Sequence, residues 1–187
     1  LNGWKIVGIC GGVMILTDDE KLAEKAHYLT TQAKDDPVRF IHNEIGYNFR
    51  LTNIQAALGI AQLEQLAEFL NCKKYIHRQY VEALETIEGL RIAVVPDYAN
   101  NNHWMNVLQI NSEIYGKDRE VLMAYFEEYR IQTCPVWALN HIQKPYWNYQ
   151  RYNIEKAEKL VNNSLCLPSS TNLNDENLNK VVDLLNG

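Results

Sequence analysis

Residues 44–66, EIGYNFRLTNIQAALGIAQLEQL, constrain the fold more than any other stretch of the chain. A polar loop led by Gly46 runs into a helix whose start is marked by Thr52 as N-cap and Gln55 as its capping-box partner. Behind this cap, apolar residues fall on every side of the helix except a strip of three glutamines. A helix that is apolar all round is buried. We therefore expect it to pack at an interface, with an ordinary core helix as the alternative.

Composition and charge exclude several classes of protein. The chain has 187 residues, 47% hydrophobic and 22% charged, enough for one domain or for a domain and part of another. A net charge of −5 without a basic tract argues against nucleic-acid binding, and the apolar runs are too short for a membrane span. The four cysteines form no CxxC pair, which favours free thiols in a reducing cytosol over a zinc site.

The first part of the chain reads as a strand and a helix before the central helix. Residues 13–16 follow a glycine-rich turn and are typical of a buried strand, and Thr17 is the expected N-cap of the next helix. No signal peptide is recognisable. Because the chain begins at Leu1 in a strand-like run, we expect it to be the C-terminal part of a longer protein.

The residues after the central helix have a different pattern of expected elements. A helix interrupted at Asn71 and Cys72 runs to about Glu88, with Gly89 as its stop signal. Pro135 makes its strand an edge strand, because proline cannot donate to a ladder. The elements expected after Gly89 are a β-rich run at 90–95, a strand at 103–110, a helix at 118–129, an edge strand at 131–137, a Tyr/Trp/Gln-rich loop at 138–153, and helices at 154–163 and around 178–185.

Several motifs together resemble the DegT/StrS-type sugar aminotransferases, which are pyridoxal-phosphate (PLP) enzymes of the aspartate-aminotransferase fold. The most specific is GYNFRLTNIQAALGIAQLEQL at 46–66, and residues 1–23, 131–137 and 162–178 agree in order and spacing. The resemblance implies an α/β protein of PLP-transferase fold type I. It also implies three parts: residues 1–70 as the end of the large cofactor domain, 71–89 as a connecting helix, and 90–187 as a small α+β C-terminal domain.

The resemblance assigns the catalytic lysine to Lys5. PLP transamination needs an amine that bonds to the cofactor aldehyde and then moves a proton on the substrate, and a lysine can do both. Asn48 matches a position that contacts the cofactor phosphate from the neighbouring subunit of a homodimer. Arg50 could bind the carboxylate of the amino donor or a substrate phosphate. Read without the resemblance, Lys5 is a surface lysine, Asn48 a turn residue and Arg50 an ion-pair partner of a glutamate.

His42 and His141 are further candidates for substrate binding. Each lies in a loop rich in Asn, Gln or aromatic residues, which suits sugar and base recognition, although a loop histidine is more often a surface residue. Three departures from the family pattern are Trp4 beside the lysine, GICGGV at 8–13 in place of a Thr- and Gly-rich turn, and Cys134 where relatives often have arginine. The aromatic residues that could stack on a base or sugar, or else belong to the core, are Trp104, Trp137, Tyr146 and Trp147.

The function implied is transfer of an amino group from glutamate to a UDP- or GDP-linked 4-keto-6-deoxy sugar, in the cytoplasm, for polysaccharide synthesis. Retention of lysine favours this over the related PLP-dependent sugar dehydratases, which use histidine there. A different class stays open: a catalytically incompetent fragment, or a domain kept for dimerisation and ligand contact. No metal, nucleic acid or membrane is implied.

Overall fold

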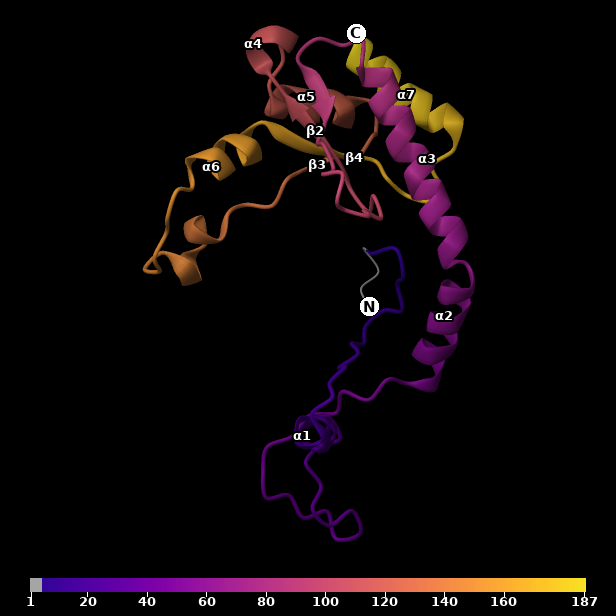
Figure 1. Cartoon of the computed structure of the whole chain (residues 1–187), viewed down its shortest axis with the longest axis vertical. Helices are drawn as coiled ribbons and strands as arrows, with labels where there is room; N and C mark the ends of the chain where they lie inside the picture. The colour runs from indigo at the N-terminus through magenta and orange to yellow at the C-terminus, as the bar shows by residue number, and fades with distance from the viewer. Residues whose placement is uncertain (1–4) are drawn as a thin grey trace. The chain divides into compact units, whose positions relative to one another are not determined.

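The computed structural model of the chain describes residues 5–187, in which helices accompany a small antiparallel sheet (Figure 1). The chain divides after Glu68 into two units. The helix expected to connect two domains is α3, Leu66–Leu84, and nearly all of it belongs to the second unit. The three-part division with boundaries at 70 and 89 stays a prediction.

The first unit contains two helices, α1 (Glu20–Thr30) and α2 (Asn53–Glu64). The expected cap of α1 was wrong: Asp19, not Thr17, is the N-cap, and its carboxylate accepts from the backbone N–H of Leu22 at 3.1 Å. The Thr17 hydroxyl instead accepts from the backbone N–H of Asp19 at 3.1 Å. Asp19 has the extended backbone conformation typical of an N-cap, with φ −86° and ψ 106°.

The predicted start of helix α2 is confirmed, and most of the helix is exposed within this chain. Thr52 and Gln55 form the complete capping box, with each side chain bonded to the other's backbone N–H. Among the helix's residues only Gly59 is buried, while Ile54 is 84% exposed and Ile60 60% exposed. Within this chain α2 is therefore not an ordinary core helix, and its packing at an interface stays a prediction.

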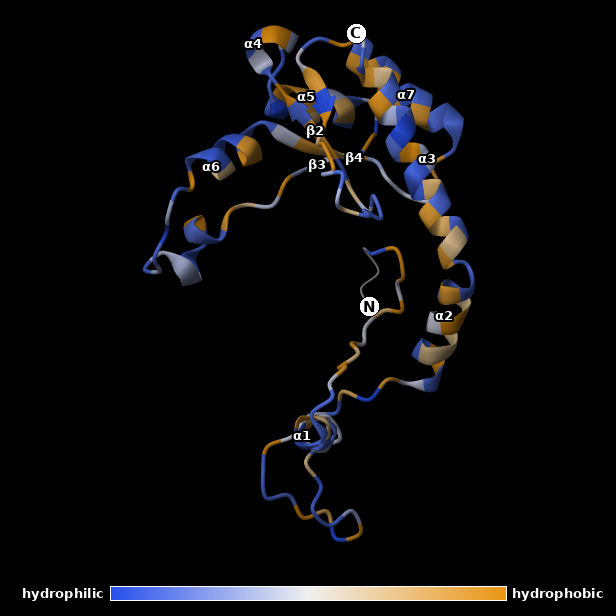
Figure 2. Ribbon diagram, in the orientation of Figure 1, coloured by the Kyte–Doolittle hydropathy of each residue, from blue (hydrophilic) through white to orange (hydrophobic). Residues whose placement is uncertain are grey.

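The strand expected at residues 13–16 is also absent from the structure. Val13, Met14 and Leu16 are each at least 80% exposed, and the segment is extended without ladder partners among the described residues (Figure 2). A strand is held by hydrogen bonds to a neighbouring strand. No described segment lies in register to provide them, so the pattern alone does not produce a strand here.

The second unit is built on a four-stranded antiparallel sheet of order β1-β2-β4-β3. Its helices in chain order are α3, α4 (Ser112–Tyr115), α5 (Arg119–Glu128), η1 (Asn140–Ile142), η2 (Lys144–Tyr146), α6 (Glu155–Asn162) and α7 (Asp175–Asn186). Its strands are β1 (Leu90–Ile92), β2 (Asn106–Ile110), β3 (Cys134–Pro135) and β4 (Ser164–Leu167).

The core of the second unit lies between one face of this sheet and three helices. Along β2 and β4 the side chains of Leu108, Leu165 and Leu167 belong to one buried cluster, as alternation predicts for a single face. Helix α3 adds Tyr80, and α5 adds Phe126. The other members of the cluster are Ile76, Leu84, Leu90, Ile92, Ile110, Leu122, Leu178, Val181, Leu184 and Leu185.

The edge strand of this unit lies where the sequence predicts it, and the break before α3 does not. Pro135 lies in β3, which is an edge strand as predicted. The expected interruption at Asn71 and Cys72 is wrong, because α3 runs through both residues and ends at Leu84 rather than near Glu88. The break between the two helices comes earlier, at Gln65, which is the C-cap of α2.

Candidate active site

The segment that follows Lys5 packs against α2. Ile9 is only 1% exposed, and its Cγ2 atom lies 3.5 Å from where a Cβ of Gly59 would be. A Cβ at Gly11 would lie 3.3 Å from Nε2 of Gln55, and both Gly11 and Gly12 have positive φ. The backbone therefore approaches the helix in a conformation that needs glycine. The glycine-rich turn expected before residue 13 is confirmed at Gly11 and Gly12, and Ile9 anchors the chain four residues beyond exposed Lys5.

The backbone at Asn48 is fixed by pairing with the end of α1. Asn48 forms an isolated antiparallel bridge with Thr31. Around it, the N–H of Tyr47 donates to the Leu29 carbonyl at 2.7 Å, and the N–H of Phe49 donates to the Thr30 carbonyl at 2.9 Å. The side chain of Asn48 is exposed, as is that of Arg50 two residues later. The sequence predicted a polar loop here, and the structure adds that its backbone is tied down on both sides.

Gly46 allows this pairing. A Cβ at Gly46 would lie 2.4 Å from the backbone N of Ala33 and 2.4 Å from the carbonyl carbon of Gln32. No side chain fits in that space, so only glycine lets the two segments come together. Ala33 is completely buried beneath this contact.

His42 is held by the same pair of segments. Its Nδ1 lies 2.8 Å from the carbonyl oxygen of Gln32 and 3.2 Å from that of Ala33. Since a carbonyl only accepts, Nδ1 carries the proton, and Nε2 of the neutral ring is an acceptor. His42 is exposed and presents a defined tautomer in the loop that also carries Asn48.

A tyrosine and an aspartate brace this loop. The Tyr28 hydroxyl donates to Asp35 at 2.9 Å, and the backbone N–H of Asn43 donates to the same carboxylate oxygen at 2.7 Å. These two hydrogen bonds hold the pKa of Asp35 below its usual value, and the bond from the Asn43 N–H contributes most. Partial burial and the bond to Asp35 raise the pKa of Tyr28 to about 12. At neutral pH the pair is thus a neutral phenol on a carboxylate, which orders the residues flanking His42.

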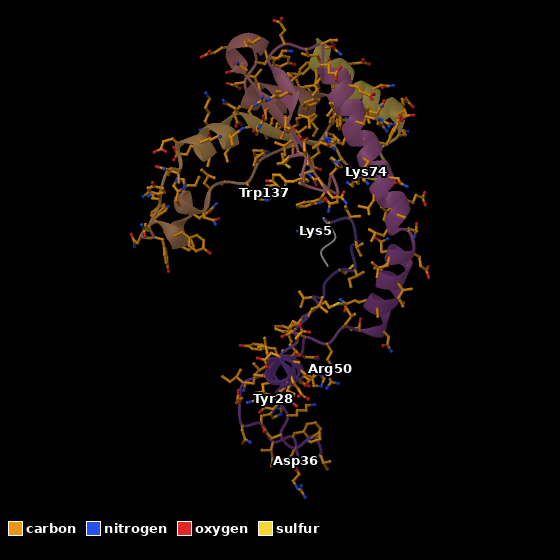
Figure 3. The ribbon with its side chains drawn as sticks, in the orientation of Figure 1. Lys5, Tyr28, Asp36, Arg50, Lys74 and Trp137 are labelled. Atoms are coloured by element: carbon orange, nitrogen blue, oxygen red, sulfur yellow. The ribbon has the colours of Figure 1, made fainter. Side chains whose placement is uncertain are left out.

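Of the predicted residues, Lys5, His42, Asn48 and Arg50 all fall in the first unit, and His141 falls in the second. Figure 3 shows Lys5 and Arg50 well apart within that unit. Asn48 lies only two residues from Arg50 in the paired loop. The structure therefore brings His42, Asn48 and Arg50 into one loop region and leaves Lys5 away from it.

His141 lies on η1, where its Nε2 is 3.2 Å from Oε1 of Glu158. Three of the aromatic candidates, Trp137, Tyr146 and Trp147, lie within six residues of His141 in the sequence. The ring centroids of Trp104 and Trp137 are 5.9 Å apart, and Trp137 is 61% exposed. Tyr146 and Trp147 are about half exposed. Exposed aromatic faces of this kind can stack on a sugar or base.

Sequence reasoning missed a polar network inside the second unit. Lys73, only 6% exposed, donates from Nζ to the carbonyl and hydroxyl oxygens of Ser169. The buried Asn106 amide donates to Ser169 Oγ at 3.3 Å and accepts from Nδ1 of His77 at 2.8 Å. Burial lowers the pKa of Lys73. One signal was available: Lys73 stands three and seven residues before the buried Ile76 and Tyr80, on the inward face of α3.

Among residues 5–187, no group of three or more His, Cys, Asp or Glu side chains is placed to hold a metal ion. No helix in this part of the chain is long and apolar enough to cross a membrane.

Comparison with known proteins identifies the fold and the family. In solved structures, the fold matches the aminotransferase TlmJ from Streptoalloteichus hindustanus, with a TM-score of 0.84 and 22% identity over 96% of this chain and 48% of that one. It also matches DesI, solved with its TDP-sugar product, with a TM-score of 0.83 and 25% identity over 96% of this chain and 46% of that one. The expected α/β PLP-transferase fold is confirmed.

Curated sequences agree with the structures. The chain is 34% identical to EpsN of Bacillus subtilis, whose name describes a pyridoxal phosphate-dependent aminotransferase, over 98% of this chain and 48% of that protein. It is 29% identical to the GDP-perosamine synthase of Caulobacter vibrioides, over 98% of this chain and 49% of that protein. The chain thus spans about half the length of these relatives. The profile of the DegT/DnrJ/EryC1/StrS aminotransferase family matches residues 2–186, and the chain belongs to that family.

Proposed function

We propose that the full-length protein uses PLP to transfer an amino group from glutamate to a nucleotide-linked 4-keto-6-deoxy sugar. The observation that carries this proposal is Lys5, which stands directly before a glycine turn packed on α2, within a family match that covers residues 2–186. Support for the substrate class comes from relatives named GDP-perosamine synthase and from DesI, which was solved with a TDP-sugar. The UDP or GDP nucleotide and the glutamate donor belong to the proposal.

The residues present fit the cofactor chemically. A primary amine at Lys5 can bond to an aldehyde, and the amide of Asn48 can donate to a phosphate oxygen without adding charge. Both side chains are exposed in this structure, so neither is engaged in the core. When bound, PLP supplies the electron sink that allows a C–N bond to be broken on the donor and formed on the acceptor.

Each chain residue then has a defined task. Lys5 holds the cofactor between turnovers and moves a proton at the reacting carbon through its amine nitrogen. Asn48 donates to the cofactor phosphate. Arg50 binds the glutamate carboxylate with its guanidinium. His42 offers Nε2 as the acceptor of a hydrogen bond from a substrate hydroxyl. In the second unit, His141 and the exposed rings of Trp137, Tyr146 and Trp147 bind the sugar and the base.

We further propose that the active protein is a homodimer in which Lys5 of one chain and Asn48 of the other serve one cofactor. Two features of the first unit support this arrangement. Figure 3 shows Lys5 and Arg50 apart, and Asn48 lies only two residues from Arg50 in the sequence. The apolar sides of α2 are exposed in the single chain, as expected of a surface that a partner covers. We place the enzyme in the cytoplasm, where its four free thiols would stay reduced.

An activity assay on the full-length protein tests the proposal. Purified enzyme is incubated with PLP, glutamate and a UDP- or GDP-linked 4-keto-6-deoxy sugar, and both 2-oxoglutarate and the amino sugar are quantified by mass spectrometry. We expect the two products in equal amounts, and none from Lys5→Ala. Loss of a sugar hydroxyl without amination would assign a dehydratase instead, and no turnover of any ketosugar would reject the substrate class.

A binding experiment addresses the cofactor separately. PLP is titrated into the full-length protein and into this 187-residue chain, and the visible absorbance of the lysine adduct is followed, with Lys5→Ala as control. Because Lys5 is exposed in the chain, we expect a tight adduct only in the full-length protein. A tight, stoichiometric and catalytically active adduct on the 187-residue chain would show that these residues alone complete the site.

A further inference from the structure

The register of the sheet places two cysteines directly opposite each other. Strands β3 and β4 are antiparallel, and Cys134 is the register partner of Cys166. Directly opposed residues of antiparallel strands have Cα atoms roughly 4.5 or 5.5 Å apart. Both separations fall inside the range of about 4.4–6.8 Å that a disulfide spans. Both cysteines are free thiols in this structure.

The two cysteine side chains lie on the same face of the sheet, because directly opposed residues of antiparallel strands project to the same side. Cys166 alternates along β4 with Leu165 and Leu167, which belong to the core cluster, so its thiol projects from the opposite face of the sheet. Cys166 is 2% exposed, whereas Cys134 is exposed. Burial, with the Cys134 thiol beside it, raises the pKa of Cys166 to about 12. One thiol is thus open to solvent and the other is held behind it.

The other two cysteines do not share this arrangement. Cys72 lies on α3, and its Sγ donates to the carbonyl oxygen of Thr171 at 3.3 Å. Cys10 lies in the first unit, at the glycine turn after Lys5.

We propose that Cys134 and Cys166 are an oxidation site that closes reversibly to an intrachain disulfide on exposure to a peroxide. The inference rests on the register of β3 and β4 and is independent of the proposed function. Because β3 leads directly into Trp137 and the aromatic loop, the bond would tie the base of that loop to the buried strand β4.

The chemistry is balanced with hydrogen peroxide as the oxidant. The exposed Cys134 sulfur attacks one peroxide oxygen, the O–O bond breaks, and the leaving hydroxide takes up a proton as water. This step leaves a sulfenic acid on Cys134. Sγ of Cys166 then loses its proton and displaces the sulfenic hydroxyl, which departs as a second water. The two thiols together lose two electrons, and one peroxide accepts them and is reduced to two waters.

The experiment uses the whole chain at low concentration. The reduced protein is treated with hydrogen peroxide, denatured in N-ethylmaleimide and weighed by mass spectrometry. We expect a monomer that has lost two of its four maleimide additions, and that regains them after dithiothreitol. Digestion with trypsin places the four cysteines in separate peptides. Without reduction, residues 131–151 and 160–180 should appear as one linked species.

Three variants serve as matched controls. Cys134→Ser and Cys166→Ser should each abolish the linked species and the paired loss of thiols, whereas Cys72→Ser should retain both. The peptide map of the wild-type chain decides the question even if a variant folds poorly. Four intact thiols, a linkage through Cys10 or Cys72, or sulfinic acid on Cys134 with Cys166 still free would each overturn the proposal.

Discussion

The two units of this chain treat their apolar residues in opposite ways. In the second unit Tyr80, Leu108 and Phe126 are completely buried within one cluster formed by the sheet and three helices. In the first unit, Ile54 on α2 and Val13 in the extended segment are each more than 80% exposed. Both regions have apolar patterns that predict burial, but only in the second unit do these side chains bury one another.

The difference shows what an apolar pattern encodes. It specifies that a surface must be covered, and it does not specify by what. The second unit supplies its own cover through long-range contacts among α3, α5, α7 and the sheet. The first unit uses its tight contacts to fix a turn and a loop, at Gly59 and Gly46, and leaves most of α2 exposed. We propose that a partner covers this surface, and that this partner is the second subunit of the homodimer.

The largest expected effect is on activity and tests whether the first unit serves a neighbouring chain. In the full-length enzyme, Lys5→Ala should lower turnover by at least about 10²–10⁴-fold, because the amine moves the proton. Mixing Lys5→Ala subunits with Asn48→Asp subunits should restore roughly a quarter of wild-type activity, since half of the dimers are mixed and each holds one intact site. Turnover after subunit exchange is the measurement.

The control for this experiment is each mutant exchanged with itself, which should stay inactive. Asn48→Asp is preferred to Asn48→Ala because it sets a carboxylate against the phosphate, whereas loss of one neutral hydrogen bond costs only about 0.5–1.5 kcal/mol. If verified mixed dimers recover no activity, Lys5 and Asn48 act on one site from the same chain.

The next effect compares the same substitution in the two units. Phe126→Ala should lower the free energy of unfolding of this chain by about 3–5 kcal/mol, because it leaves a cavity beneath the sheet. Phe49→Ala, at a side chain that is 68% exposed, should change it by less than about 0.5 kcal/mol. Urea unfolding followed by circular dichroism measures both. Equal losses would show that the first unit has a core of its own.

A smaller effect concerns the close contact between Gly59 of α2 and Ile9. Gly59→Leu should destabilise the first unit by about 1–3 kcal/mol, because the added side chain meets Ile9. Gly59→Ala is the control: its Cβ would lie at an ordinary 3.5 Å from Ile9, and alanine favours a helix by about 0.5–1 kcal/mol over glycine. Hydrogen exchange of α2 amides separates the two. Equal protection in both variants would contradict the packing of Ile9 on Gly59.

The smallest effect is on pH dependence and contrasts a buried lysine with an exposed one. Burial lowers the pKa of folded Lys73 below the ordinary 10.5 of the unfolded chain. Between these two values the unfolded state binds more protons, so stability rises with pH, by at most about 1.4 kcal/mol per pH unit. Lys73→Met should remove this rise, measured as unfolding free energies from pH 7 to 9.5. That range stays below the ordinary tyrosine pKa of 10.0.

Lys25→Met is the matched control in the first unit. Lys25 is about half exposed and pairs with Glu44 at 2.5 Å, and this change should leave the rise in place. A wild-type slope that persists in Lys73→Met would show that the buried ammonium is not the group responsible.

The sequence by itself determined the features whose causes lie within a few residues. The capping box of Thr52 and Gln55 fixes the start of α2, because donor and acceptor are three residues apart. The spacing of Ile76, Tyr80 and Leu84 identifies the inward face of α3, since helical periodicity is local. The motif at residues 46–66 identified the family, and Pro135 marked β3 as an edge strand.

Only the tertiary structure decided the features that depend on residues far apart. Ser164–Leu167 is buried on both faces and has no period, so nothing local marked it as the inner strand β4. The extended residues 13–16 form no strand, because a ladder needs a neighbour. The network of Lys73 with Ser169 and the facing of Cys134 and Cys166 likewise arise from the register of the folded chain. Burial, pairing and pKa shifts are properties of neighbours in space, and folding alone brings those neighbours together.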